Sequence, residues 1–270
     1  MYIIKANGKK EDFSLEKTKR SCLRAGATPQ VAEEIAQRIN RQFKKGMTTR
    51  ELSHLIFRYL SKNNPVTASR YSLRGALFRL GPAGFVFEKM VARIFQEQGY
   101  QTKNNQILEG HCVSHEIDVL LEKDNKIFAI ECKFHRAPGF YTDIKEALYT
   151  WARFFDLKEG QTSVSLENVW LVSNTKFSEQ VKQFAQCRQI NLLGWAYPQE
   201  KSLQMMIEEK KLYPITILRS IEKNFEERLI KEGIIVCQDL VNLEPRKFQA
   251  ETGLDARKIS ILQKEAEQLL

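Results

Sequence analysis

The 270-residue sequence predicts an α/β fold in three parts: a mostly helical segment, a sandwich around a mixed sheet, and a small helical domain. Two observations support this prediction. Short apolar runs alternate with helix-length patterns over residues 87–195, which is typical of a mixed sheet covered by helices. The residues before and after this region instead place apolar side chains at helical spacing, in stretches divided by glycine and proline.

The first segment is predicted to open with a strand at Tyr2–Ala6. A turn at Asn7-Gly8 follows, and it is a strong hairpin signal because both central positions of such a turn need positive φ. Ser14 is expected to cap a helix that runs to Arg24. Further helices are predicted at Pro29–Phe43, from Thr48/Thr49 onward, and at Val66–Leu80.

The middle segment is predicted to start after Gly81-Pro82-Ala83-Gly84, which we take as a domain boundary. Its helices are expected at Phe87–Gln98, Thr142–Phe155 and Ser178–Arg188, and its strands at Ile117–Leu121, Ile127–Glu131, Val169–Val172 and Ile190–Trp195. The expected domains are therefore residues 1–83, 84–213 and 214–270, the last of them helical and broken by Gly233, Pro245 and Gly253.

The net charge of +9 is concentrated at the N-terminal end. Residues 1–85 carry 17 Lys/Arg and 6 Asp/Glu, whereas residues 86–213 and 214–270 each carry one net negative charge. A basic segment of this kind favours a polyphosphate partner, either nucleotide or nucleic acid, and a solvated basic surface is the alternative. No apolar run approaches the roughly 18 residues of a membrane span, no signal peptide is visible, and the five cysteines form no CxxC pair. We therefore expect a cytoplasmic protein with no membrane partner.

The residues with recognisable chemistry are Glu88, Asp118, Glu131 and Lys133. Asp118 and Glu131 interrupt two neighbouring apolar strands, and Glu131 and Lys133 share a strand face because they are two residues apart. If the strands pair as a hairpin, the two carboxylates approach and repel each other unless a cation lies between them. Oxygen ligands of this kind suit Mg²⁺, and Lys133 could orient a water molecule and offset phosphate charge. The alternative is a pair of solvent-facing acids, but ionised groups seldom interrupt apolar strands without a partner.

This pattern resembles the PD-(D/E)xK restriction-endonuclease superfamily, and more narrowly its Mrr-like branch. The segments that carry the resemblance are Gly84–Glu88, His115–Asp118 and Glu131–Lys133, over roughly residues 84–200. The resemblance implies a restriction-endonuclease-like mixed-sheet sandwich. It also implies Asp118 and Glu131 as ligands of Mg²⁺ or Mn²⁺, Lys133 as the catalytic lysine and Glu88 as an auxiliary catalytic acid. Glu116-Ile117 stands before Asp118 in place of the proline that gives the superfamily its name.

The opening of the chain resembles an ATP-cone, a small regulatory nucleotide-binding domain known from ribonucleotide reductases and their transcriptional repressor. The residues that carry this resemblance are Ile4–Gly8, Glu11, Phe13, Lys17 and Arg24–Ala27. It implies ATP or dATP as a regulatory ligand. The implied nucleotide-binding residues are Ile4, Lys5, Glu11, Ser14, Lys17 and Thr49. No GxxxxGK[ST] loop is present, so we do not expect this domain to hydrolyse ATP.

Three further features leave alternatives open. The glycines of Leu229–Ile235 and Thr252–Lys258 resemble the hairpins of helix-hairpin-helix domains, which implies contacts to DNA phosphates, but a packing or dimerisation module fits equally well. Lys145, Tyr149 and Arg153 lie on one helical face, either touching DNA or forming a solvated stripe. His115 is either a phosphate contact or a surface histidine.

The leading interpretation is a metal-dependent endonuclease that acts on double-stranded DNA under control of ATP or dATP. The alternative is a non-catalytic, nucleotide-sensing, DNA-binding regulator on a nuclease fold, and a ribonuclease is a third reading. Cleavage of both strands needs two active sites, and a chain with one set of catalytic residues supplies them most simply as a homodimer or higher homo-oligomer.

Overall fold

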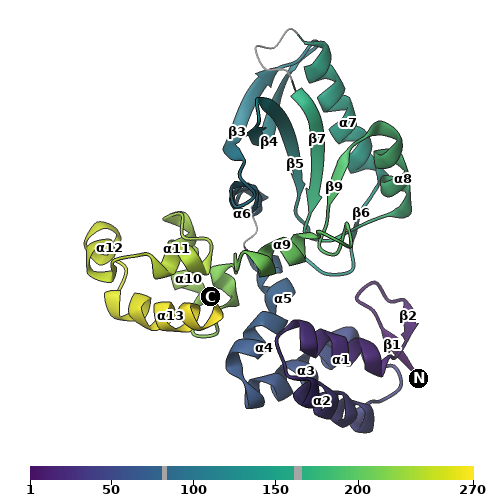
Figure 1. The fold of residues 1–270 in the computed structure, drawn as a ribbon, viewed down its shortest axis with the longest axis vertical. Helices are drawn as coiled ribbons and strands as arrows, with labels where there is room; N and C mark the ends of the chain where they lie inside the picture. Colours follow the sequence, from purple (N-terminus) through teal and green to yellow (C-terminus); the bar gives the residue numbers. More distant parts are fainter. Residues whose placement is uncertain (81–83, 161–165) are drawn as a thin grey trace. The chain divides into compact units, whose positions relative to one another are not determined.

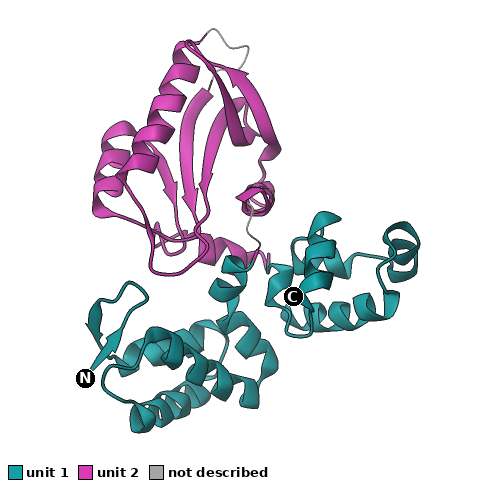
Figure 2. Cartoon of the chain, turned by 180° about the vertical axis from the view of Figure 1, so that it is seen from behind, with its two compact units in different colours: residues 1–79, 213–270 teal, residues 80–212 magenta. Residues whose placement is uncertain are grey.

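The computed structural model describes residues 1–80, 84–160 and 166–270 (Figure 1). The chain divides into two compact units (Figure 2): residues 1–79 with 213–270 form unit 1, and residues 80–212 form unit 2. The first three residues of the predicted boundary, 81–83, lie outside the described residues. Within the described ranges, no helix has the length and apolar character needed to cross a membrane.

Unit 2 contains a mixed sheet, as predicted, with strands in the order β3-β4-β5-β7-β9 (Figure 1). The first three strands pair antiparallel, whereas β5, β7 and β9 run parallel to one another. A short parallel pair, β6 and β8, lies apart from this sheet. The strands are β3 (Gln101–Glu109), β4 (Ser114–Lys123), β5 (Lys126–Lys133), β6 (Tyr141–Thr142), β7 (Leu166–Ser173), β8 (Lys176–Phe177) and β9 (Asn191–Leu193).

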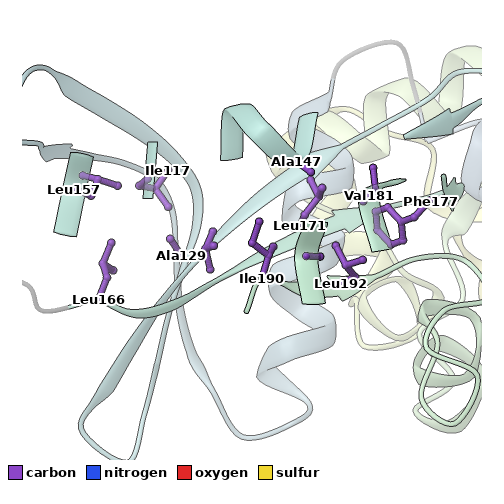
Figure 3. Close-up of a cluster of buried hydrophobic side chains, with 12 residues drawn as sticks. Ile117, Ala129, Ala147, Leu157, Leu166, Leu171, Phe177, Val181, Ile190 and Leu192 are labelled. Atoms are coloured by element: carbon purple, nitrogen blue, oxygen red, sulfur yellow. The ribbon is translucent and has the colours of Figure 1, made fainter. Parts of the chain in front are cut away.

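Two helices, α7 (Ile144–Glu159) and α8 (Glu179–Arg188), cover one face of this sheet (Figure 1). Their side chains pack with those of the strands in an apolar cluster, shown in Figure 3, in which Ala147, Leu171 and Val181 have no exposed surface. Burial of apolar surface of this kind is the main term that stabilises a domain. The remaining helices of the unit are α6 (Gly84–Gln96), which contacts β3, β4 and β5, and α9 (Leu203–Glu209).

Strand β3 was missed by the sequence reasoning. Its residues alternate between exposed and half-buried positions, with none fully buried, and most of them are polar. The sequence therefore lacks the apolar alternation that marks a strand, and the segment becomes a strand because β4 pairs with it along nearly its whole length. Tertiary pairing, and not local propensity, decides this element.

The N-terminal part of unit 1 is a short hairpin followed by helices, as predicted. Ser14 caps α1 and Thr48 caps α3, each accepting a hydrogen bond from the backbone three residues on. The predicted single helix at Val66–Leu80 is wrong, because the chain forms two helices that meet at Ser72, whose amide and hydroxyl both donate to the Ser69 carbonyl. The elements are β1 (Tyr2–Ile4), β2 (Lys10–Asp12), α1 (Leu15–Arg24), α2 (Pro29–Gln42), α3 (Thr49–Asn63), α4 (Pro65–Tyr71) and α5 (Leu73–Phe78).

The C-terminal part of unit 1 is helical, as predicted, and Gly233 and Gly253 take positive φ values of 85° and 70° between its helices. It contacts the N-terminal part within the unit. The buried Thr216 hydroxyl donates to the Ala76 carbonyl at 2.8 Å, and Arg79 donates to the Thr216 carbonyl at 2.6 Å. The elements are the 3₁₀ turn η1 (Ile215–Ile217), α10 (Lys223–Lys231), α11 (Cys237–Val241), α12 (Pro245–Thr252) and α13 (Ala256–Leu269).

Candidate nuclease and nucleotide sites

The Asp118 carboxylate is fixed where the pairing of β4 with β5 ends. The antiparallel ladder runs as far as Val119 opposite Ile130. One step beyond, Asp118 Oδ2 accepts a hydrogen bond from the Cys132 amide at 2.6 Å. Along β4, Ile117, Val119 and Leu121 are buried, and Asp118 and Leu120 between them are half-buried. The Asp118 carboxylate is therefore partly accessible and is held against β5 by the Cys132 amide.

Glu131 is paired with an arginine from α7. Arg153 Nη1 lies 2.5 Å from Glu131 Oε2, and only 14% of the arginine side chain and 23% of the glutamate side chain are exposed. Arg153 also donates to the Glu116 carbonyl on β4. One guanidinium group therefore joins α7 to both strands that carry the acidic residues.

Lys133 also contacts α7. It is two residues from Glu131 on β5, so both side chains are on the face of the strand that α7 covers. Its Nζ lies 3.1 Å from Glu146 Oε1, and 41% of the Lys133 side chain is exposed. The ammonium group is therefore held in place from one side and open to solvent from the other. A lysine in this setting is available to a phosphate or a water molecule.

Burial is the largest cause of a raised pKa at three carboxyl groups of the site, Glu88, Asp118 and Glu131. Burial is the largest cause of the rise in the Glu131 pKa to about 7, with repulsion from Asp118 next, against the attraction of Arg153 and Lys133. Burial, then repulsion from Asp118 and Glu116, raises the pKa of Glu88 on α6 to about 7. Burial also raises the pKa of Asp118, against the hydrogen bond from Cys132. The site thus concentrates negative charge that Arg153 and Lys133 do not fully balance.

The donor set fits a hard divalent cation. Within the described part of the chain, no group of three or more His, Cys, Asp and Glu side chains is arranged around a single metal position. Mg²⁺ does not need such a cage, because it keeps several waters and commonly binds one or two carboxylates together with substrate phosphate. Asp118 and Glu131 are two partly buried, mutually repelling carboxylates, which is the charge distribution that a cation would relieve.

The structure shows where the residues of two open alternatives lie. Arg153 is neither solvated nor free, since Glu131 pairs with it, whereas Lys145 and Tyr149 are exposed. His115 is bound to Asp156, with Nε2 2.7 Å from Oδ2 and 14% of each side chain exposed, so it is not a surface histidine. Sequence reasoning missed Glu146 altogether, because nothing in its local pattern places it beside Lys133.

A second polar cluster lies on the N-terminal hairpin. Glu11 forms ion pairs with Lys5 and with Lys17, the latter at 2.8 Å, and the hydrogen bonds from Lys17 and Lys5 lower the Glu11 pKa to about 2. The Ser14 hydroxyl accepts from the Lys17 amide at 3.2 Å. These four residues are thus brought together by β1, β2 and the start of α1.

Two further predicted nucleotide contacts, Ile4 and Thr49, are linked through the backbone. Ile4 forms an isolated parallel bridge to Thr48, and its amide donates to the Met47 carbonyl at 3.0 Å. Thr48 caps α3, whose first residue is Thr49. The N-terminal end of α3 is therefore tied to β1, where its free amides add a partial positive charge.

Three family models match the chain in succession. The ATP cone domain model matches residues 1–77, the Restriction endonuclease model matches residues 83–195, and the model described as AF1548-like, C-terminal matches residues 213–270. Both resemblances read from the sequence, to the ATP-cone and to the restriction endonucleases, are thereby confirmed. The C-terminal helices match a family model of their own.

Relatives come from Archaeoglobus fulgidus. An uncharacterized protein from this organism is 44% identical over 181 residues, which are 67% of this chain and 99% of the relative. A second uncharacterized protein from it is 43% identical over 44 residues, 16% of this chain and 94% of that relative. Among solved structures, the protein of unknown function AF1548 is 42% identical with a TM-score of 0.61, over 69% of this chain and 98% of that one.

Proposed function

Since the chain belongs to the AF1548-like family and carries a restriction-endonuclease domain behind an ATP-cone, we propose that it is a metal-dependent DNA endonuclease regulated by ATP or dATP. In this proposal residues 1–83 bind the nucleotide, residues 84–213 cut DNA, and residues 214–270 form a helical accessory domain. The observation that carries the proposal is the group of Glu88, Asp118 and Glu131, whose carboxyl pKa values are all raised, next to a half-open lysine.

Each residue of the nuclease site has a separate task in this proposal. Asp118 and Glu131 would hold Mg²⁺ or Mn²⁺, which when bound would stabilise charge on the phosphate and lower the pKa of a water molecule. Lys133 donates hydrogen bonds to that water or to a phosphate oxygen, and Glu146 keeps its ammonium group in position. Glu88, with a pKa of about 7, is able to exchange a proton near neutral pH.

The test is cleavage of supercoiled plasmid DNA in Mg²⁺, with and without ATP or dATP. Lys133→Ala should lower the cleavage rate by roughly 100-fold or more, the loss typical when one polar group of a hydrolytic site is removed. Lys126→Ala is the matched control, because Lys126 lies at the other end of β5 and pairs with Glu167. Equal rates for the Lys133→Ala variant and the wild type would refute the assignment.

The N-terminal cluster supports the nucleotide part of the proposal. Lys5 and Lys17 both bind Glu11, so a phosphate chain that binds there competes with a carboxylate for the same two ammonium groups. In this proposal Ile4, Ser14 and Thr49 also contact the nucleotide. Calorimetry with ATP and dATP tests it directly, and no heat at millimolar nucleotide would remove the nucleotide-binding assignment.

One observation favours the second candidate, a non-catalytic DNA-binding regulator. Glu131 and Lys133 are both occupied by ion pairs, with Arg153 and Glu146 respectively. A regulator with this site would bind DNA equally well with or without Mg²⁺ and would leave plasmid intact at every nucleotide concentration. The cleavage assay above therefore separates the two candidates.

A further inference from the structure

Helix α3 of unit 1 carries a row of four basic residues. Arg50, His54, Arg58 and Lys62 follow one another at four-residue intervals, and all four are exposed. Residues four apart are neighbours on one side of a helix, about 6 Å apart along its axis, so the row extends over about 18 Å. The opposite side of α3 packs inward through Ile56 and Leu60, which are 3% and 1% exposed. We name these four residues the α3 row.

The α3 row has no counterion among the residues that the structure describes. None of its four members forms an ion pair with any residue in the described ranges. Other lysines of unit 1 do have acidic partners, as the half-buried Lys19 does in Glu33 and the exposed Lys258 in Glu222. Glu51 is the acid closest in sequence, but its carboxylate is taken up by the Thr48 amide and hydroxyl at 2.8 and 2.7 Å.

We propose that the α3 row is a docking surface for the phosphate backbone of double-stranded DNA, separate from the nuclease site and beginning at Arg50, next to the proposed nucleotide contact Thr49. Each strand of the duplex carries one phosphate per 3.4 Å of its axis, so a row of about 18 Å passes about five phosphates of one strand. Arginine binds phosphate with a planar pair of donors, and two of the four members are arginines. A phosphate backbone supplies the regularly spaced negative charge that the described chain does not.

This inference rests on the proposed function, because it names a surface on which the proposed substrate is held. It gives the concentrated basic charge of residues 1–85 a role beyond the binding of one nucleotide. Contacts to the phosphate backbone fix position and add affinity without reading base sequence. The α3 row therefore raises affinity for any duplex, and sequence preference, if present, is set elsewhere in the chain.

The test is binding of the full chain to a fluorescein-labelled 30-base-pair DNA duplex, followed by fluorescence anisotropy in EDTA over a series of salt concentrations. The triple variant Arg50→Gln, Arg58→Gln, Lys62→Gln should bind at least tenfold more weakly at low salt. The plot of log K against log salt concentration should become less steep, with the magnitude of its negative slope smaller by about 2 to 3. This change corresponds to about 0.9 for each phosphate that the variant no longer neutralises. Glu51 and Thr48 stay unchanged in this variant, so that the cap of α3 is preserved, and circular dichroism checks its folding.

The matched control removes the same three charges from the neighbouring helix and loop, as Arg41→Gln, Lys44→Gln, Lys45→Gln, all of them exposed. An equal drop in affinity in both variants would show a general charge effect and overturn the proposal. So would unchanged DNA binding by the α3 variant, even if its self-association or its binding to an RNA duplex were abolished. Plasmid cleavage in Mg²⁺ is measured in parallel. If DNA binding depends on the α3 row but the wild type does not cleave, the proposed function is refuted and this inference stands. If the wild type cleaves but DNA binding does not depend on the α3 row, only this inference is refuted.

Discussion

Replacing Glu131 by glutamine should stabilise the metal-free protein while it abolishes cleavage. The Glu131 side chain is 23% exposed, and its pKa is raised from 4.5 to about 7 in the folded chain. A group whose pKa is higher in the folded than in the unfolded state binds protons preferentially in the fold, so its ionisation destabilises the fold as pH rises. Glutamine has nearly the same shape, stays neutral at every pH, and still accepts a hydrogen bond from Arg153.

The size of the effect follows from the two pKa values. Above pH 7 the ionised carboxylate lowers stability by at most about 3 kcal/mol, at 1.36 kcal/mol per pKa unit, and glutamine removes this penalty. At pH 5 most of the folded-state carboxyl groups are already protonated, and the difference between wild type and variant should shrink to about 1 kcal/mol. The stability gap should therefore open as pH rises from 5 to 8.

Guanidinium unfolding in EDTA measures this difference in the free energy of unfolding between variant and wild type. Tryptophan fluorescence follows the unfolding of unit 2 alone. All three tryptophans of the chain, Trp151, Trp170 and Trp195, lie in that unit. Glu122→Gln on β4 is the control, because Glu122 is exposed, and surface changes of this kind alter stability by less than about 0.5 kcal/mol. Adding Mg²⁺ should stabilise the wild type and not the Glu131→Gln variant. A gap of equal size at pH 5 and pH 8, or a less stable variant at pH 8, would refute the reasoning.

Three further predictions concern the remaining parts of the chain. Glu146→Gln should lower the cleavage rate by roughly tenfold with little change in DNA affinity, because it frees Lys133 without removing it. Single-turnover cleavage measures the rate and a binding titration measures the affinity. An unchanged rate would show that Glu146 has no positioning role. Lys5→Ala should weaken ATP binding at least tenfold in calorimetry, whereas the exposed Lys9→Ala on the same hairpin should not. Light scattering should show at least a dimer whose mass distribution responds to ATP or dATP, and a monomer that still cuts both strands would rule that coupling out.

Much of the fold followed from local patterns that the final structure keeps. Asn7-Gly8 predicted the N-terminal hairpin, although only Gly8 of the two takes a positive φ, and Ser14 predicted the start of α1, because these residues act within a few positions of themselves. Of the elements that sequence reasoning missed, α9 has a local cap at Ser202, whereas β3 depends on a distant partner. Strand β3 is polar and forms only because β4 pairs with it. The break at Ser72 is hidden in an otherwise continuous helical pattern.

The candidate site shows the same division. Asp118 and Glu131 could be singled out because a charged residue inside an apolar strand is conspicuous in the sequence. Arg153 and Glu146 could not, since both lie on an amphipathic helix where a charged residue is ordinary, and only the packing of α7 on the sheet brings them to β5. Sequence patterns thus identify residues that violate local expectations, whereas their partners become visible only in three dimensions.

The pairing of Arg153 with Glu131 bears on how the proposed metal would bind. The guanidinium partly neutralises Glu131, yet the pKa of this carboxyl stays near 7, because burial and Asp118 together outweigh Arg153 and Lys133. A divalent ion between Asp118 and Glu131 would supply the charge that one arginine does not, so Glu131 would bind metal as an ionised ligand. Arg153 would keep its second contact, to the Glu116 carbonyl, and so remain beside the site. Arg153 joins α7 to both acidic strands through Glu131 and the Glu116 carbonyl, so we expect it to position Glu131 in the proposed nuclease site with or without metal.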